Sequence, residues 1–215
     1  MPRRLADTAG LTAKGIATRG RIVHEAAALM YEHGVAGTSL DDVKAKADVS
    51  SSQLYHYFAD KTALVRAVIA HQVDTVLDGQ ADHLAALDSV AALRAWAEAL
   101  VRVRRGRRCQ GGCPIGSLGS ELAEIDATLR TEVAAGFRRW ENSIRDGLRA
   151  MHARGELRAD ADPDALAVAL LASVQGGILL SQVHRDSKPM ETALDTMLDY
   201  IESLVTTKRR ATARK

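Results

Sequence analysis

Several features are scarce or missing in this chain of 215 residues, and each absence excludes a class of protein. The two cysteines, Cys109 and Cys113, are too few for a disulfide scaffold, and no nearby histidine completes a set of four zinc ligands. We find no apolar run near the roughly 18–20 residues of a membrane helix, and no apolar signal core at the N-terminus. We therefore expect a cytoplasmic chain with no metal, no cofactor and no membrane partner.

Signatures of catalysis are also missing. The seven histidines are scattered along the chain, and no catalytic motif surrounds any of them. The glycine-rich stretch 105–116 lacks the Gly-Lys-Ser/Thr ending of a phosphate-binding loop. Hydrophobic residues at 47% and charged residues at 26% are typical of a globular protein with one or two domains. We expect a compact protein that is not an enzyme.

Three closely spaced helix starts are the strongest positive signal. Ser39 with Asp42, and Ser50 with Gln53, each match the capping box, in which a Ser side chain and the acid or amide three residues later bond each other's backbone N–H groups. Asp60 is placed to cap a third helix. Helices that start so close together predict a compact helix-turn-helix.

The middle helix of this group, about Ser51–Tyr57, has the features of a recognition helix. Leu54 and Phe58 point inward, which leaves the polar N-terminal side chains free for base edges in the major groove. Lys61 can reach a phosphate at the start of the next helix. The predicted DNA-binding residues are Thr38, Ser39, Ser50, Ser51, Ser52, Gln53, Tyr55, His56, Tyr57 and Lys61.

The sequence Leu-Tyr-His-Tyr-Phe-Ala-Asp-Lys at residues 54–61 resembles the signature of the TetR/AcrR family of one-component transcriptional regulators. The resemblance covers Arg19 to about Ile69, and it departs from the family at Asp48, where a glycine is usual. It implies an all-α fold of the TetR type, with an N-terminal three-helix helix-turn-helix domain and a C-terminal helical ligand-binding and dimerisation domain. It also implies a double-stranded DNA operator as partner.

We place the DNA-binding domain with an N-terminal arm at residues 1–62, the effector-binding and dimerisation domain at 63–207, and a basic tail at 208–215. The tail carries five basic and no acidic side chains. The arm is expected to follow the DNA backbone or enter a minor groove. The basic residues that precede or open the first helix are Arg3, Arg4, Lys14, Arg19 and Arg21. The alternative that both tails are simply solvated stays open.

Hydrophobic periodicity predicts nine helices and no strand. The helix at 163–184 is apolar on nearly all sides, so it must be covered all round, and Gly176 and Gly177 suit a close approach of another backbone. In the family resemblance the last two helices, 163–184 and 190–205, form a homodimer interface; a core helix covered within one chain is the alternative. The expected helices are 18–33, 40–47, 51–57, 61–83, 90–104, 117–124, 127–154, 163–184 and 190–205.

The segment 112–118 with Glu121 resembles a subgroup of the LmrA/YxaF type, which implies a response to small organic molecules. Effector pockets are mostly apolar with few polar groups. Large side chains at helical spacing also occur in ordinary cores, so that alternative stays open. The candidate effector-binding residues are Trp96, Phe137, Trp140 and Gln175.

Two further functions stay open. Cys109 and Cys113 lie among arginines, a setting that lowers a thiol pKa, so both are candidate redox residues of an electrophile-sensing repressor. A helical binding module that does not bind DNA is the other alternative. The main prediction is a ligand-responsive transcriptional repressor that binds a palindromic operator as a dimer and is released by a small organic effector.

Overall fold

A computed structural model describes residues 10–206, and within that range the chain is all helical. Its one β feature there is an isolated antiparallel bridge between Leu157 and Val205. The all-α prediction is therefore confirmed. The helices are α2 (Ala13–His33), α3 (Leu40–Ala47), α4 (Ser51–Tyr57), α5 (Lys61–Asp78), α6 (Ala81–Leu84), α7 (Val90–Gly106), α8 (Pro114–Leu122), α9 (Ala127–Ala153), α10 (Pro163–His184) and α11 (Lys188–Ser203).

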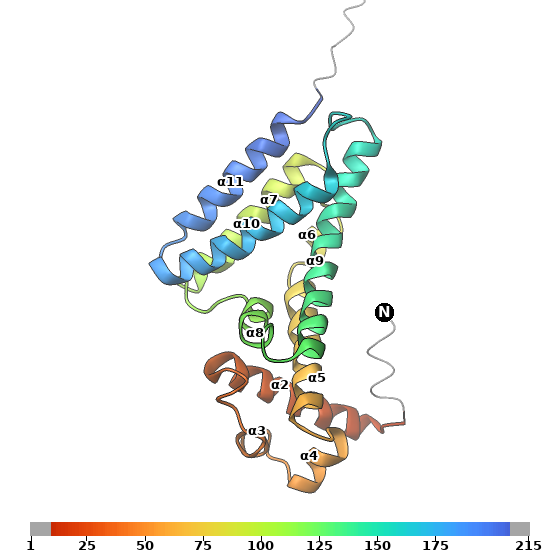
Figure 1. Cartoon of the computed structure of the whole chain (residues 1–215), viewed down its shortest axis with the longest axis vertical. Helices are drawn as coiled ribbons and strands as arrows, with labels where there is room; N and C mark the ends of the chain where they lie inside the picture. Colours follow the sequence, from red (N-terminus) through yellow and green to blue (C-terminus); the bar gives the residue numbers. More distant parts are fainter. Residues whose placement is uncertain (1–9, 207–215) are drawn as a thin grey trace, which may run out of the picture. The chain divides into compact units, whose positions relative to one another are not determined.

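The helices form two compact units (Figure 1). Unit 1 comprises the described residues up to Val76 together with Pro114–Gly136, and unit 2 comprises Leu77–Cys113 and the described residues from Phe137 onward. The chain thus passes between the units three times. The functional boundary between residues 62 and 63 stays a prediction, since compactness alone does not assign roles.

Unit 1 packs the three predicted helices against α5 and the first turns of α9. Ile22, Val43, Leu54 and Leu64 are fully buried at the centre of this unit. Gly136 of α9 lies so close to α5 that a Cβ atom there would be 2.3 Å from Cγ2 of Val73. The N-terminal end of α9 therefore belongs to unit 1 rather than to unit 2.

Unit 2 is built around the pair α10 and α11, which lie side by side (Figure 1). A Cβ atom on Gly177 would be 2.8 Å from the Cα atom of Met190, so this glycine lets the two backbones approach each other. The fully buried Ser181 accepts a hydrogen bond from the Met190 N–H at 3.3 Å. The close backbone predicted at the glycine pair is thus supplied at Gly177 by the same chain.

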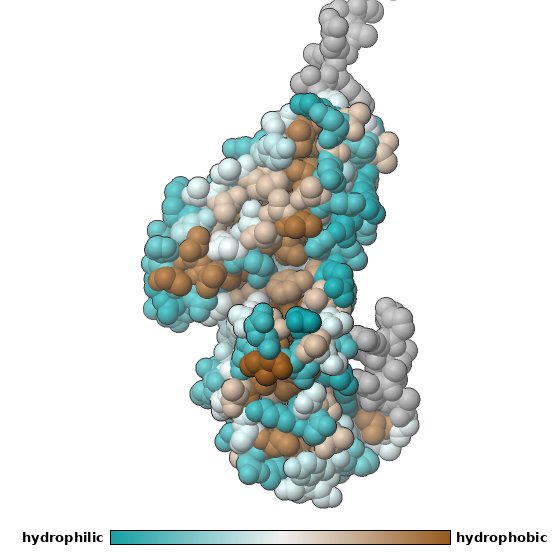
Figure 2. Space-filling view, in the orientation of Figure 1, coloured by the Kyte–Doolittle hydropathy of each residue, from teal (hydrophilic) through white to brown (hydrophobic). Residues whose placement is uncertain are grey.

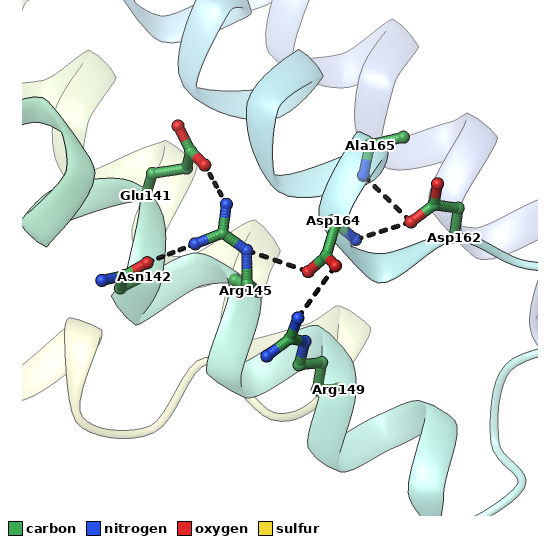
Figure 3. A network of polar contacts seen from close by, with 7 residues as sticks. All are labelled: Glu141, Asn142, Arg145, Arg149, Asp162, Asp164 and Ala165. Atoms are coloured by element: carbon green, nitrogen blue, oxygen red, sulfur yellow. Dashed lines mark hydrogen bonds and ion pairs between the residues drawn. The ribbon is translucent and has the colours of Figure 1, made fainter.

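A network of charged residues attaches the start of α10 to α9 (Figure 3). Asp162 caps α10 by accepting from the N–H groups of Asp164 and Ala165. The Asp164 carboxylate forms ion pairs with the Nε of Arg145 at 2.9 Å and with a terminal guanidinium nitrogen of Arg149 at 2.8 Å. The hydrogen bond from Arg149, followed by the positive charges of both arginines, holds the pKa of Asp164 below its ordinary value.

Several helix boundaries differ from the predicted ones. The first described helix begins at Ala13 instead of 18, since Thr12 caps it by accepting from the Gly15 N–H at 3.2 Å. Lys14 therefore lies in a helix and not in a segment before it, and Arg19 and Arg21 lie further along the same helix. Arg3, Arg4 and the tail 208–215 lie outside the described residues. The helix predicted at 61–83 is broken between Asp78 and Ala81.

The loop in the glycine-rich stretch is shorter than predicted. Helix α7 continues to Gly106, and α8 begins at Pro114, because proline suits the first turn of a helix, where its missing N–H has no partner to lose. The helical spacing of Leu93, Trp96, Leu100 and Val103 predicts that these four residues share the buried face of α7. Val103 is instead 53% exposed, and the buried face includes Ala97, Val101 and Arg104.

The apolar character of α10 corrects the prediction that the chain has no apolar run near the length of a membrane helix. This helix of 22 residues contains an 18-residue stretch with a mean hydropathy of 1.8, so by length and composition it is long and apolar enough to cross a membrane. About 44% of its apolar stretch is buried within the protein, and core helices meet the same criterion. The packing of Gly177 and Ser181 on α11 favours a packed helix with one uncovered face.

Candidate nucleic-acid interface

The recognition helix α4 has the cap that its sequence predicts. The Ser50 hydroxyl accepts from the Gln53 N–H at 3.1 Å, and the Gln53 side-chain oxygen accepts from the Ser50 N–H at 2.9 Å. This use of the Gln53 oxygen leaves its Nε2 group as the donor available for a base. Leu54 and Phe58 are 0% and 3% exposed, so α4 is anchored by its apolar side.

The preceding helix α3 ends in a tight turn that fixes the direction of α4. Asp42 and Ser39 form the second capping box, and the hydrogen bonds from Ser39 lower the pKa of the Asp42 carboxyl. Asp48 adopts the left-handed conformation with φ +48° and ψ +59°, the conformation for which a glycine is usual and which Asp tolerates better than most residues. Three residues, 48–50, separate the two helices.

An exposed polar surface results on α4. Its members are Ser51, Ser52, Gln53, Tyr55 and His56. Tyr55 is 55% exposed and has no hydrogen bond within the described chain, whereas the Ser51 hydroxyl receives the Lys44 ammonium group at 2.9 Å. Hydroxyl, amide and phenol groups are suited to hydrogen bonds with bases, and the lysine provides positive charge for phosphate.

The remaining predicted contact residues lie in different settings. Thr38 is 1% exposed and its hydroxyl donates to the Gly34 carbonyl at 2.8 Å, so its side chain belongs to the interior, and we leave it out of the proposed contacts. The Tyr57 hydroxyl lies near the start of α2, 3.4 Å from where a Cβ of Gly15 would stand. Lys61 is half-buried at the first position of α5, next to Asp60, which accepts from the Ala63 N–H.

Two arginines that were predicted as possible DNA contacts at the start of the first helix instead make contacts within the helix-turn-helix. The Arg21 Nε donates to the Ala47 carbonyl at the end of α3 at 2.9 Å. The Arg19 guanidinium lies 5.1 Å from the centre of the Phe58 ring. Their partners lie more than 20 residues away in the chain, so no local pattern could have revealed these roles.

The candidate effector-binding residues all lie in unit 2, and they differ in whether their buried polar atoms have hydrogen-bond partners. Trp96 is fully buried and its Nε1 donates to the Gln80 side chain at 2.8 Å. Trp140 is 2% exposed, yet its Nε1 has no hydrogen-bond partner among the described residues, and neither has the buried Nε2 of Gln175. Phe137 is half-buried. Buried donors without partners are rare in folded proteins, so these two call for an acceptor.

The cysteines are both buried, with Cys109 at 4% and Cys113 at 8% exposure. No disulfide joins them in the described chain. Cys109 and its neighbour Arg108 both have positive φ angles, so the chain turns sharply just after the end of α7. Between residues 10 and 206 no group of three or more His, Cys, Asp or Glu side chains has the arrangement of a metal site.

A large apolar surface lies along α10 and α11 (Figure 2). On α10 it consists of a single stripe that contains Val168, Leu179, Leu180 and Val183, each about half exposed or more. A groove of about 960 Å³ runs beside this stripe, and it is lined by residues of both helices, among them Leu180, Met197 and Tyr200. Gly176 lies in the exposed stripe with nothing within 4 Å of a Cβ placed there.

Comparison with known proteins identifies the family of this chain. The profile described as "Bacterial regulatory proteins, tetR family" matches residues 22–68, and "Tetracyclin repressor-like, C-terminal domain" matches residues 89–197. The chain is 30% identical over 171 residues to transcriptional regulator AcuR of Cereibacter sphaeroides, covering 76% of this chain and 75% of AcuR. It is 26% identical to the HTH-type transcriptional repressor DhaR of Mycobacterium sp. GP1, covering 85% and 91% of the two chains.

A TetR transcriptional regulator from Chloroflexus aurantiacus has a similar structure, with a TM-score of 0.77 and 28% identity over 90% of this chain and 98% of that one. The helix-turn-helix with its exposed α4, joined to a helical second unit, defines a DNA-binding transcriptional regulator. The chain belongs to the TetR family, as its signature residues predicted. YxaF of Bacillus subtilis is also among its relatives, at 24% identity over 80% of this chain and 89% of YxaF.

Proposed function

We propose that this regulator is a repressor that binds a palindromic operator as a homodimer and is released by a small organic effector. The observation that carries the proposal is the exposed polar face of α4, held by two capping boxes and a buried apolar side. A regulator of this kind acts in the cytoplasm, where its operator DNA is. Relatives named as a transcriptional repressor and as transcriptional regulators support the assignment.

The DNA contacts of the proposal divide by chemistry. Ser51, Ser52, Gln53, Tyr55 and His56 face the bases, and Lys61 contacts a phosphate at the start of α5. Base contacts provide sequence specificity, whereas phosphate contacts provide affinity for any DNA.

Binding to selected DNA tests this division. An operator is selected from a random duplex pool, and its affinity is compared with that of a scrambled duplex by fluorescence anisotropy. Tyr55→Ala should weaken operator binding by about 1–3 kcal/mol and leave the scrambled duplex nearly unaffected. A wild-type chain that does not distinguish the two duplexes contradicts the proposed function.

The homodimer is proposed to form through α10 and α11. An uncovered apolar stripe of this length is typical of an interface, and two such helices from each of two chains make a four-helix bundle. Gly176, open in the single chain, would allow a close approach of the second copy. Gly177 does not serve this purpose, because it already packs on Met190.

A matched pair of variants tests the interface. Leu179→Asp places a charge in the stripe, whereas Ile125→Asp places one at a similarly exposed apolar residue outside α10 and α11; the two side chains are 59% and 74% exposed. Sedimentation should show a monomer for Leu179→Asp and a dimer for Ile125→Asp. A dimer in both cases would place the interface elsewhere.

The effector is proposed to carry a hydrogen-bond acceptor that reaches Trp140 and Gln175. The support is that both side chains have buried donors without partners, in a unit otherwise rich in apolar side chains. A carbonyl, carboxylate or hydroxyl oxygen would satisfy them. Burial of both thiols limits the access of an oxidant, so we prefer a small-molecule effector to redox sensing through Cys109 and Cys113.

The two tryptophans provide a controlled test. Small carbonyl and carboxylate compounds are screened by thermal shift, and the active ones are titrated by calorimetry. Trp140→Phe keeps an aromatic ring, though a smaller one, and removes the N–H; it should weaken binding by about 0.5–1.5 kcal/mol. Trp96→Phe makes the same change in size and should leave binding unchanged, because that N–H is already bonded to Gln80. By linkage, operator DNA should weaken compound binding. Equal affinities for free and DNA-bound protein would exclude release by this route.

A further inference from the structure

Glu121 on α8 makes an unusual contact with the turn between α2 and α3. Its two carboxylate oxygens each accept one backbone N–H, from Val35 at 2.8 Å and from Ala36 at 2.7 Å. All of these residues belong to unit 1. Hydrogen bonds to a charged acceptor are roughly twice as strong as those between neutral groups, so this clamp is a strong local link.

The local backbone is arranged to receive the carboxylate. Gly34 ends α2 with φ +75°, which turns the next two N–H groups toward α8. A Cβ atom on Gly34 would stand 3.1 Å from a Glu121 carboxylate oxygen, so a side chain at this position would crowd the clamp. The Thr38 hydroxyl bonds to the Gly34 carbonyl on the other side, so the turn that leads into α3 is held from both ends.

Packing at this junction is incomplete on one side of α8, although Ile115, Leu118 and Leu122 are buried. A cavity of about 80 Å³ lies where α8 meets α2 and α5, and Glu121 lines it together with Leu118 and Gln72. The carboxylate therefore holds α8 to the turn beside an incompletely filled contact. From the turn the link continues through α3 to α4, because Lys44 bonds to Ser51 and Arg21 bonds to the Ala47 carbonyl.

We infer that Glu121 is a positioning residue for operator reading: its clamp on the Val35 and Ala36 amides holds α3 and α4 in the arrangement that binds the operator. The inference rests on the proposed function and deepens it, because it places a control point for DNA affinity outside residues 22–68, the part matched by the DNA-binding profile. A shift of α8 then lowers operator affinity with every DNA-contacting side chain still present.

Three variants of the full chain test the inference against the selected operator and the scrambled duplex. Glu121→Ala removes both acceptors, Glu121→Gln keeps one acceptor oxygen, and Glu124→Ala removes an exposed carboxylate just after the same helix. If the binding-competent fraction falls to about a tenth, operator affinity falls about tenfold for Glu121→Ala. Glu121→Gln should lie between that variant and the wild type, and Glu124→Ala should match the wild type.

Two readouts separate positioning from general damage. Scrambled-duplex affinity and the salt slope should stay unchanged for Glu121→Ala, because no phosphate contact is lost. Hydrogen exchange of the Val35 and Ala36 amides should accelerate in that variant, while exchange within α10 does not change.

Operator binding by Glu121→Ala within twofold of the wild type, or an equal loss on both duplexes, would overturn the inference. So would unchanged exchange at Val35 and Ala36. A wild type that does not discriminate between the duplexes would instead reject the proposed function, whatever these two amides show.

Discussion

The two adjacent glycines of α10 allow a stability prediction in which the helix propensity cancels. Replacing either glycine by alanine gains the same helix propensity, about 1 kcal/mol. At Gly177 the added methyl group would be 2.8 Å from Cα and 3.0 Å from Cγ of Met190, whereas at Gly176 nothing lies within 4 Å. The difference between Gly177→Ala and Gly176→Ala therefore isolates the cost of crowding the contact between α10 and α11.

The size of this cost follows from the contact. Carbon atoms pack best at about 3.5–4.0 Å, and a backbone Cα cannot move aside by a change of rotamer, so the helices must separate. Overpacking of this kind costs about 1–3 kcal/mol. In a chain of this length each kcal/mol shifts the melting temperature by about 2–4 °C, so Gly177→Ala should melt about 4–8 °C below Gly176→Ala for a cost near 2 kcal/mol.

Tryptophan fluorescence is a suitable assay, because Trp96 and Trp140 are the two tryptophans of the chain and both lie in unit 2. Melting is measured at a concentration at which sedimentation shows a monomer, so that a second copy does not cover Gly176. If the two variants melt within 1 °C of each other, Gly177 does not lie against Met190 and the described packing of α10 on α11 is refuted.

Three further predictions concern DNA, caps and acid. Lys61→Ala should weaken operator and scrambled DNA alike and reduce the salt slope by about 0.9, which anisotropy at several salt concentrations measures; an operator-specific loss would contradict a phosphate contact. Ser50→Ala should destabilise unit 1 by about 1 kcal/mol in urea, while Ser52→Ala, on the same exposed face but not the cap, should cost only a few tenths. The pKa values of Asp42, Asp160, Asp164 and Glu191 lie below their ordinary values, so the stability they contribute is present above about pH 4 and is lost as pH falls through the lowered values. Because this contribution is constant at higher pH, melting temperatures measured from pH 8 to pH 3 should show no change from these groups above pH 5 and a decline below it; the absence of a decline between pH 5 and pH 3 would refute their role.

The sequence alone determined the features that depend on neighbours three or four residues away. Both capping boxes and the burial of Leu54 and Phe58 follow from local hydrogen bonding and helical periodicity, and the structure has all of them. The limits of this local information appear on α7, where several apolar residues compete for the buried face. There the prediction that Val103 is buried was wrong, because an alanine-rich helix has more than one apolar face that can pack against the core.

Only the tertiary structure decided contacts between distant parts of the chain. Glu121 meets backbone amides 86 and 85 residues away, and nothing about a lone glutamate predicts such a partner. The same holds for the two glycines of α10. The sequence predicted that another backbone segment lies close to them, but only the fold shows that Gly177 faces Met190 of the same chain and that Gly176 faces outward. Sequence periodicity defines the faces of a helix, whereas the fold determines what covers each face.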